Sequence, residues 1–158
     1  MTLPFVAIYI INQVKLRRLI AGIPAEKLSE LIGMSDAYIS GIESMATKSQ
    51  YPLDVLAKIA KVLTCEVRDF YPPDELLLKN DGSNVLKEII SLADTEGASN
   101  VINGMIEFGY FKKPKSFTNI AKHLQIYGKP EVPIVEQALN NFVANGKLTL
   151  TNGSYVQP

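Results

Sequence analysis

The chain has 158 residues, of which 47% are apolar and 20% are charged, and its formal net charge is zero. This length allows one ordinary domain or two small ones, and the apolar content predicts a packed globular protein. A neutral chain has no overall attraction to nucleic acid or to an anionic membrane. The charge is unevenly distributed, because residues 72–107 are acidic while residues 108–158 carry six lysines against two acids. We therefore expect two electrostatically different parts.

The scarcity of cysteine and histidine argues against a disulfide, a metal site and catalysis. Cys65 is the only cysteine, which excludes an internal disulfide and a multi-cysteine metal site. His123 is the only histidine, so a Ser-His-Asp, Cys-His or zinc arrangement has one candidate and no evident partner. We expect a protein that is not an enzyme and that holds no metal and no cofactor.

The chain opens with the apolar run TLPFVAIYII. This run lacks a basic leader and a small-residue cleavage site, and at about ten residues it is too short to span a bilayer. We expect it to form a strand or lead-in that packs on the first helix. The predicted location is cytoplasmic, with no membrane contact.

Short helices are predicted in the first part of the chain. Apolar residues at helical spacing predict a helix over residues 10–21, ended by Gly22. Pro24 suits the first position of a second helix, because its missing N–H costs nothing there, and Gly33 ends that helix. The side chains of the second helix expected in the core are Leu28, Leu31 and Ile32.

A third and a fourth helix are predicted after Gly33. Ser35 can cap the third helix through its hydroxyl, with Ile39 and Ile42 facing inward. The run LDVLAKIAKVL predicts the fourth helix, and Phe70 anchors a short turn after it. The core face of the fourth helix is expected to consist of Leu53, Leu56, Ile59, Ala60 and Leu63.

These segments resemble the helix-turn-helix family of Cro/phage-repressor type, also called the xenobiotic-response-element family. The resemblance rests on VKLRRLIAG, EKLSELIGMSDAYISGIES and YPLDVLAKIAKVLTCEVRDF, and it covers residues 10–71, under half of the chain. It implies a repressor-type domain of four to five helices over residues 1–71, whose third helix enters the DNA major groove. It also implies a structural ion pair between Arg18 and Glu43.

A linker is predicted over residues 72–83, which are acidic and contain two prolines and the run Asn-Asp-Gly-Ser. After it, NVLKEIISLA and SNVINGMIEFGYF each predict a helix. Ser116 can cap a further helix, and Pro133 opens a last one that Gly146 ends.

A β-hairpin is predicted at the end of the chain, where KLTLTNGSYVQ alternates around Asn152 and Gly153. Three helices followed by a two-stranded ribbon resemble a winged-helix domain, here over residues 84–158. The predicted fold class is therefore mainly α: a repressor-type helix-turn-helix domain followed by a winged-helix-like domain with a C-terminal β-hairpin.

The outward face of the third helix bears on whether the fold reads DNA. If Ile39 faces inward, a step of about 100° per residue places Ala37, Ser40, Gly41 and Ser44 outward. Base readout usually relies on Arg, Lys, Asn or Gln, because these side chains can bond a base edge in two places. None of these types lies on this face.

Three positions also depart from the family pattern. The family often has arginine where this chain has Gly41, and a backbone-clamping glutamine where it has Ala25. Asp36 replaces a basic or polar residue and would repel phosphate. Small hydroxyl side chains and nearby cations can still contact DNA. The candidate contacts of the first domain are Arg17, Lys27, Ser35, Ala37, Tyr38, Ser40, Gly41, Ser44, Lys48 and Gln50.

The lysines of the second domain mark a candidate phosphate-binding face, although any one of them could simply be a solvated surface residue. The candidate contacts there are Lys122, Lys129, Asn140, Asn141 and Lys147.

Two functions are consistent with these residues. The first is a non-catalytic transcription regulator that binds double-stranded DNA as a homodimer, with Phe5–Ile10 and a helix over Val85–Leu92 as candidate interface elements. The alternative is a protein-interaction or dimerisation adaptor that keeps the helix-turn-helix fold without base readout. The small side chains on the third helix favour this alternative, because they would let a partner helix approach closely.

Overall fold

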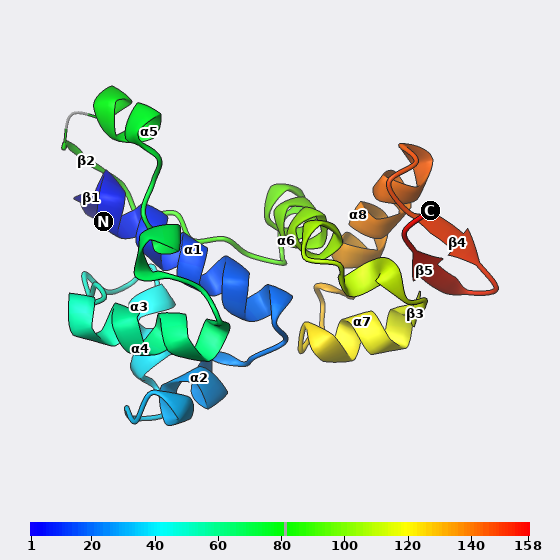
Figure 1. The fold of residues 1–158 in the computed structure, drawn as a ribbon, viewed down its shortest axis with the longest axis horizontal. Helices are drawn as coiled ribbons and strands as arrows, with labels where there is room; N and C mark the ends of the chain where they lie inside the picture. Colours follow the sequence, from blue (N-terminus) through cyan, green and yellow to red (C-terminus); the bar gives the residue numbers. More distant parts are fainter. Residues whose placement is uncertain (81) are drawn as a thin grey trace. The chain divides into compact units, whose positions relative to one another are not determined.

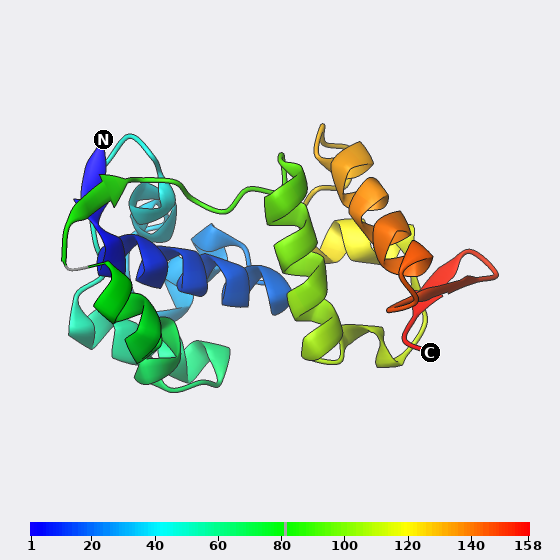
Figure 2. The ribbon, with the colours of Figure 1, turned by 90° about the horizontal axis from the view of Figure 1, so that it is seen from above.

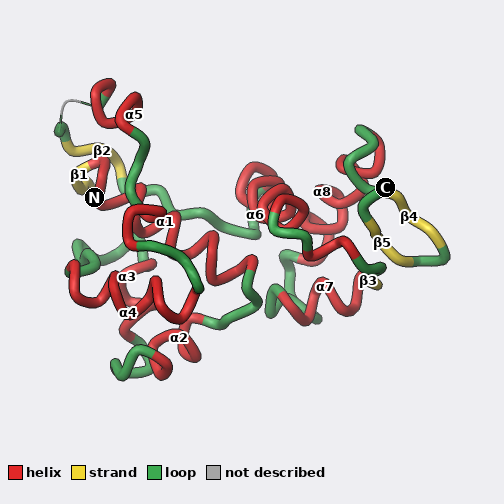
Figure 3. Tube along the Cα trace, in the orientation of Figure 1, coloured by secondary structure: helices red, strands yellow, loops and turns green. Residues whose placement is uncertain are grey.

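A computed structural model describes residues 1–80 and 82–158 and is mainly helical (Figure 1). The chain divides into two compact units, Met1–Ile90 and Ser91–Pro158, which are described here one at a time. The predicted mainly helical fold with short C-terminal strands is confirmed (Figure 3). Within the described residues, no helix has the length and apolarity needed to cross a membrane.

The first unit contains five α-helices, one short 3-10 helix and two short strands among its described residues. They are β1 (Thr2–Pro4), α1 (Phe5–Ile20), α2 (Ala25–Leu31), α3 (Tyr38–Glu43), α4 (Leu53–Leu63), η1 (Val67–Phe70), α5 (Asp74–Lys79) and β2 (Asn84–Leu86). All of these elements except α5 contribute apolar side chains to one core, whose fully buried members include Ile11, Val14, Leu28, Ile39, Leu56, Ile59 and Phe70.

The first helix is longer than predicted. It begins at Phe5 rather than near residue 10, so only Thr2–Pro4 of the apolar opening forms a strand. Pro4 precedes the helix with extended backbone, which suits a residue whose φ is fixed by its ring. The candidate interface element Phe5–Ile10 therefore lies in α1, and Ala7, Ile8 and Ile10 of this segment are buried within the unit.

Most of the predicted core positions are confirmed, but two leucines are not. Leu31 is 49% exposed and Leu53 is 65% exposed, while Leu28 and Leu56 are fully buried. Leu31 is the last residue of α2 and Leu53 the first residue of α4. Helical spacing gives their angular position correctly but does not show that each lies beyond the edge of the core.

The helix predicted over residues 85–92 is wrong. Asn84–Leu86 forms β2, which pairs antiparallel with β1 in the register Thr2↔Leu86. The side chain of Asn12 then holds the next residues, because its amide donates to the Glu88 carbonyl at 2.9 Å and accepts from the Ile90 N–H at 2.8 Å. These bonds hold the segment extended along the first unit.

The predicted linker also contains regular structure. Asp74–Lys79 forms α5, which opens after Pro73 with Asp74 and Glu75 in its first turn, where the helix dipole favours acids. None of the residues of α5, all of which are described, is buried. Asp81, which belongs to the predicted linker, lies outside the described residues.

The second unit combines three helices with a small sheet (Figure 2). Its elements are α6 (Thr95–Glu107), η2 (Tyr110–Lys112), β3 (Lys115–Ser116), α7 (Phe117–His123), α8 (Val132–Ala144), β4 (Thr149–Thr151) and β5 (Ser154–Val156). The three strands are antiparallel in the order β3–β5–β4. The fully buried side chains of this core include Ile102, Met105, Phe111, Ile120, Leu139 and Leu148.

The predicted C-terminal hairpin is confirmed. Asn152 and Gly153 connect β4 to β5 with φ values of 51° and 75°, the left-handed pair that a two-residue hairpin turn requires. Asparagine and glycine adopt this backbone most easily, which is why the dipeptide predicts the turn.

Candidate nucleic-acid interface

The turn between α2 and α3 and the inward side of α3 are built as the sequence predicts. Gly33 ends the second helix with a φ of 74°, a left-handed backbone that favours glycine. Ile39 and Ile42 point into the core and are 0% and 3% exposed. The opposite face of α3 therefore lies at the surface of the first unit.

The cap of the third helix comes from a different serine than predicted. The helix begins at Tyr38, and among the described residues the Ser35 side chain makes no capping bond to it. Instead Ser29, fully buried on α2, accepts the Ile39 N–H at 3.1 Å and donates to the Ala25 carbonyl at 2.9 Å. Because α2 packs close to the start of α3, the Ser29 hydroxyl is near enough to accept the free Ile39 N–H.

The predicted ion pair between Arg18 and Glu43 is confirmed. The guanidinium meets the carboxylate in a two-point contact, with Nε to Oε1 at 2.7 Å and Nη2 to Oε2 at 2.5 Å. Both side chains are buried, and Nη1 of Arg18 also donates to the Ile23 carbonyl at 3.3 Å. Burial and the nearby Glu43 carboxylate raise the pKa of Tyr51, so its hydroxyl stays protonated beside the pair. The contact joins α1 to the end of α3.

A buried lysine that the sequence analysis missed holds the C-terminal end of α3. Nζ of Lys87 donates to the carbonyls of Ile42, Ser44 and Thr47 at 2.7–2.9 Å, and the side chain is almost fully buried. Burial lowers the pKa of Lys87, while the three carbonyl oxygens favour its charged form. A cation at this position complements the negative end of a helix. No local pattern reveals the contact, because its partners lie at least 40 residues away.

The outward face of α3 carries small side chains with little to offer a base edge. Ala37 and Ser40 are exposed, and Gly41 and Ser44 are half-buried. The Ser40 hydroxyl donates to the Ala37 carbonyl at 3.2 Å, and Ser44 Oγ accepts the Ala46 N–H at 3.2 Å. A methyl group added at Gly41 would meet open space, so packing within the unit does not require glycine there.

The charges around this face are mainly acidic. Glu26, Glu30 and Asp36 are exposed, and Lys27 is paired with Glu30 at 3.1 Å. Half-buried Tyr38 lies on the flank towards α4, where burial and then Asp54 raise the pKa of its hydroxyl.

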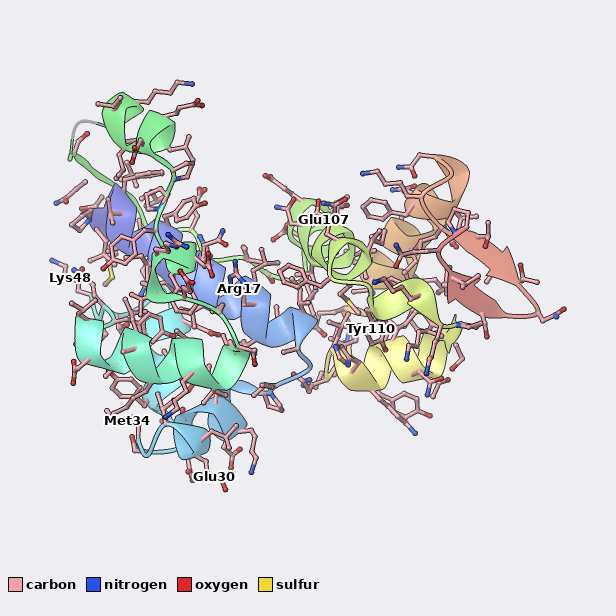
Figure 4. The ribbon with its side chains drawn as sticks, viewed as in Figure 1. Arg17, Glu30, Met34, Lys48, Glu107 and Tyr110 are labelled. Atoms are coloured by element: carbon pink, nitrogen blue, oxygen red, sulfur yellow. The ribbon has the colours of Figure 1, made fainter. Side chains whose placement is uncertain are left out.

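The remaining candidate contacts of the first unit are dispersed. Lys48 and Gln50 are exposed in the loop after α3, and Ser35 is exposed in the turn before it. Arg17 lies half-buried on α1 (Figure 4). Burial raises the pKa of the Cys65 thiol after α4, and the Arg17 charge acts to lower it. Arg17 therefore lies on the side of α1 that faces the α4–η1 turn.

In the second unit, α7 and α8 are set by a cap and by apolar packing. Ser116 accepts the Asn119 N–H at 3.2 Å and so caps α7, as predicted. Pro133 lies in the first turn of α8, and Gly146 follows its end with a φ of 80°. Val135 and Leu139 bury the inner face of α8 against the unit's core.

The outward face of α8 carries a row of amide side chains. Gln137, Asn140 and Asn141 are all exposed, and Gln137 donates to the Asn141 side-chain oxygen at 3.1 Å. The Tyr155 hydroxyl of β5 donates to the Asn140 side-chain oxygen at 3.2 Å. Asn140 and Asn141 were predicted contacts, whereas Gln137 was missed although the same helical spacing places it beside them. Glu136 is the countervailing charge on this face.

The predicted lysine contacts lie near both ends of α8. Lys122 lies in the last turn of α7 and Lys129 in the α7–α8 turn, and the Lys122 ammonium lies 5.4 Å from the centre of the Tyr127 ring. Lys147 follows α8 and leads into β4. Its ammonium lies 5.7 Å from the centre of the Phe142 ring and donates to Asn103 at 3.2 Å.

The described residues assemble no metal site, and His123 packs against an aromatic ring. Within residues 1–80 and 82–158, no three His, Cys, Asp or Glu side chains are placed to hold a metal ion. The His123 ring packs against Tyr110, with ring centres 4.5 Å apart, and Figure 4 shows Tyr110 on the segment that follows α6.

Comparison with known proteins bears on the first unit. No curated protein and no solved structure matches the chain. Residues 14–70, a little over a third of the chain, match the helix-turn-helix family model, which is of Cro/C1 type. This segment contains α2, the turn and α3 with the buried contacts described above. The match indicates that the protein carries a DNA-binding helix-turn-helix domain of regulatory kind.

Proposed function

We propose that the protein is a non-catalytic transcription regulator that binds double-stranded DNA, with α8 of the second unit as its main base-reading helix. The single observation that carries the assignment to α8 is the row of exposed amides Gln137, Asn140 and Asn141. Asparagine and glutamine can bond adenine at two points in the major groove. The small side chains on α3 offer no such contact.

The order of elements in the second unit supports a winged-helix-like domain. In α6, β3, α7, α8 and the β4–β5 hairpin, α7 and α8 form a second helix-turn-helix and the hairpin forms the wing. Lys122, Lys129 and Lys147 can then contact phosphates at both ends of α8. The first unit contributes backbone contacts through Lys48 and the hydroxyls around α3. A cytoplasmic homodimer agrees with this function, and light scattering of the purified chain tests the dimer.

Salt-dependent binding tests the proposal directly. A labelled duplex of mixed sequence should bind at low salt, and the logarithm of the affinity should fall linearly with the logarithm of the salt concentration. Replacing both Lys122 and Lys129 by alanine should weaken binding to all sequences and reduce the slope by roughly 2, about one per lost phosphate contact. The matched control is Lys61→Ala, which removes an exposed lysine of α4 and should leave the slope unchanged.

Base readout is tested by a selection from random duplexes. The triple change of Gln137, Asn140 and Asn141 to alanine should flatten the sequence preference, since each bidentate base contact contributes about 1–3 kcal/mol of discrimination. Ser40→Ala and Tyr38→Ala should leave the preference unchanged. If the sequence preference changes only with the α3 variants, then α3 of the first unit is the base-reading helix.

The alternative function, a protein-interaction adaptor, is favoured by one observation. Leu31, Met45 and Leu53 are exposed on or beside the α2–α3–α4 segment, at 49%, 61% and 65%, in a region that also carries exposed acids. A chain that ignores duplex DNA in dilute buffer but binds a protein through this face would be an adaptor.

A further inference from the structure

The second unit contains a pocket between α7 and the turn that leads into α8. Its volume is about 480 Å³, within the range of small-molecule sites in proteins. Its walls are mainly apolar: the rings of Phe117 and Tyr127 and the prolines Pro130 and Pro133 contribute to them. Flat rings and prolines are rigid, so the pocket suits a flat apolar body.

The polar groups of the pocket favour an acid as its ligand. The polar groups of its lining side chains are the hydroxyls of Thr118 and Tyr127 and the ammonium of Lys129, and all three residues are exposed. Within residues 1–80 and 82–158, no carboxylate forms an ion pair with the Lys129 ammonium. Glu131 stands in the same turn, but its side chain is not part of the lining. Lys129 therefore supplies the cation of the pocket lining, while the Lys122 ammonium lies outside the lining, 5.4 Å from the centre of the Tyr127 ring.

We propose that this pocket binds a small aromatic carboxylic acid, whose ring lies between Phe117 and Tyr127 and whose carboxylate pairs with Lys129, and that the bound acid weakens duplex binding. The effect on DNA rests on the proposed function. Pro133 belongs to the first turn of α8, and Lys129 is a proposed phosphate contact. An acid in the pocket neutralises that lysine and fills the space where the groove helix begins.

Three probes of the same shape test the ligand chemistry on the full chain. 2-Naphthoate, 2-naphthylmethanol and 2-naphthylmethylamine differ in charge but share one ring system. When each probe is titrated into the protein, the backbone amide signals of Thr118, Gly128 and Lys129 should shift. 2-Naphthoate should bind roughly threefold more tightly than the alcohol, because an exposed charge contact contributes about that much affinity. Tighter binding of the amine, or shifts elsewhere, would overturn the proposal.

Two variants distinguish binding in the pocket from non-specific binding of the acid to the protein surface. Thr118→Trp places a bulky ring in the pocket from its exposed rim and should weaken 2-naphthoate binding at least tenfold. Its matched control is Thr95→Trp, at an exposed position of α6 outside the pocket, which should bind like the unchanged chain. Lys129→Ala should remove the preference for the acid over the alcohol. A folded Thr118→Trp variant with undiminished binding would contradict the assignment.

The effect on DNA is measured last, so that the two proposals can fail separately. Saturating 2-naphthoate should weaken duplex affinity at least threefold in the unchanged chain and leave it unaltered in Thr118→Trp. If the chain without any acid does not bind a duplex, the proposed function fails, whatever the pocket binds. If it binds both the duplex and the acid but the two do not compete, the pocket has no such regulatory role.

Discussion

The two candidate groove helices, α3 and α8, differ in the contacts that hold them and in the side chains on their outer faces. α3 is fixed by buried polar groups: Ser29 at its start, Arg18 against Glu43, and Lys87 at its end. Its outer face carries small side chains that cannot bond a base edge at two points. α8 is fixed mainly by apolar packing, and it presents its amides outward. A helix-turn-helix shape therefore does not by itself say which helix reads DNA.

Glu43→Ala should have the largest effect on the first unit. It leaves the Arg18 guanidinium buried without its carboxylate, a change that typically costs about 3–5 kcal/mol of unfolding free energy. Hydrogen exchange of the Val14 and Ile59 amides measures that loss in the first unit. Glu30→Ala removes an exposed ion pair and should cost under about 1 kcal/mol. Equal losses would mean that the buried pair is not what holds α3.

Leu139→Ala probes the apolar attachment of α8 in the same way. Leu139 is fully buried, so its truncation should cost about 2–5 kcal/mol, set by the cavity it leaves. Hydrogen exchange of the Ile102 and Ile120 amides reports the loss within the second unit. Asn141→Ala, on the exposed face of the same helix, should change these rates little. A costly Asn141→Ala would show that the amide row is structural.

Lys87→Met tests the cation at the end of α3. Methionine keeps the length of the side chain but leaves one buried and two partly buried carbonyls without their donor, which should cost about 2–3 kcal/mol. The control is Lys79→Met on α5, where the lysine is exposed and the expected effect is within about 0.5 kcal/mol. Fraying of α3 in the Lys87 variant should appear as faster exchange of its last amides.

A serine pair gives the smallest expected difference. Ser29→Ala removes the cap on the Ile39 N–H and should cost about 1–2 kcal/mol, whereas Ser35→Ala should be nearly neutral. Chemical denaturation with residue-level detection distinguishes them. The reverse order of the two losses would restore Ser35 as the cap.

Much of the fold could be predicted because its signals are local. Gly33, the spacing of Ile39 and Ile42, and the Asn152-Gly153 turn each act within a few residues. What escaped prediction depends on distant partners. The strand β2 has only three residues and exists through pairing with β1, at least 80 residues earlier.

In the candidate site, too, local features could be predicted and contacts between distant residues could not. The exposed faces of α3 and α8 follow from helical periodicity, and Gln137 could have been identified by the step that found Asn140 and Asn141. The contacts of Lys87 and Ser29 could not, because each joins a side chain to backbone groups whose position only the tertiary structure determines. The pocket beside α8 likewise forms only when the α7–α8 turn closes.

The assignment of base readout to α8 is tested most directly by titrating the labelled full chain with a duplex of about 20 base pairs at low salt and following every backbone amide. The account predicts that the signals of α8, the α7–α8 turn and the β4–β5 hairpin shift most, with smaller changes around Lys48. Shifts concentrated on Ala37–Ser44, with the second unit unperturbed, would contradict it.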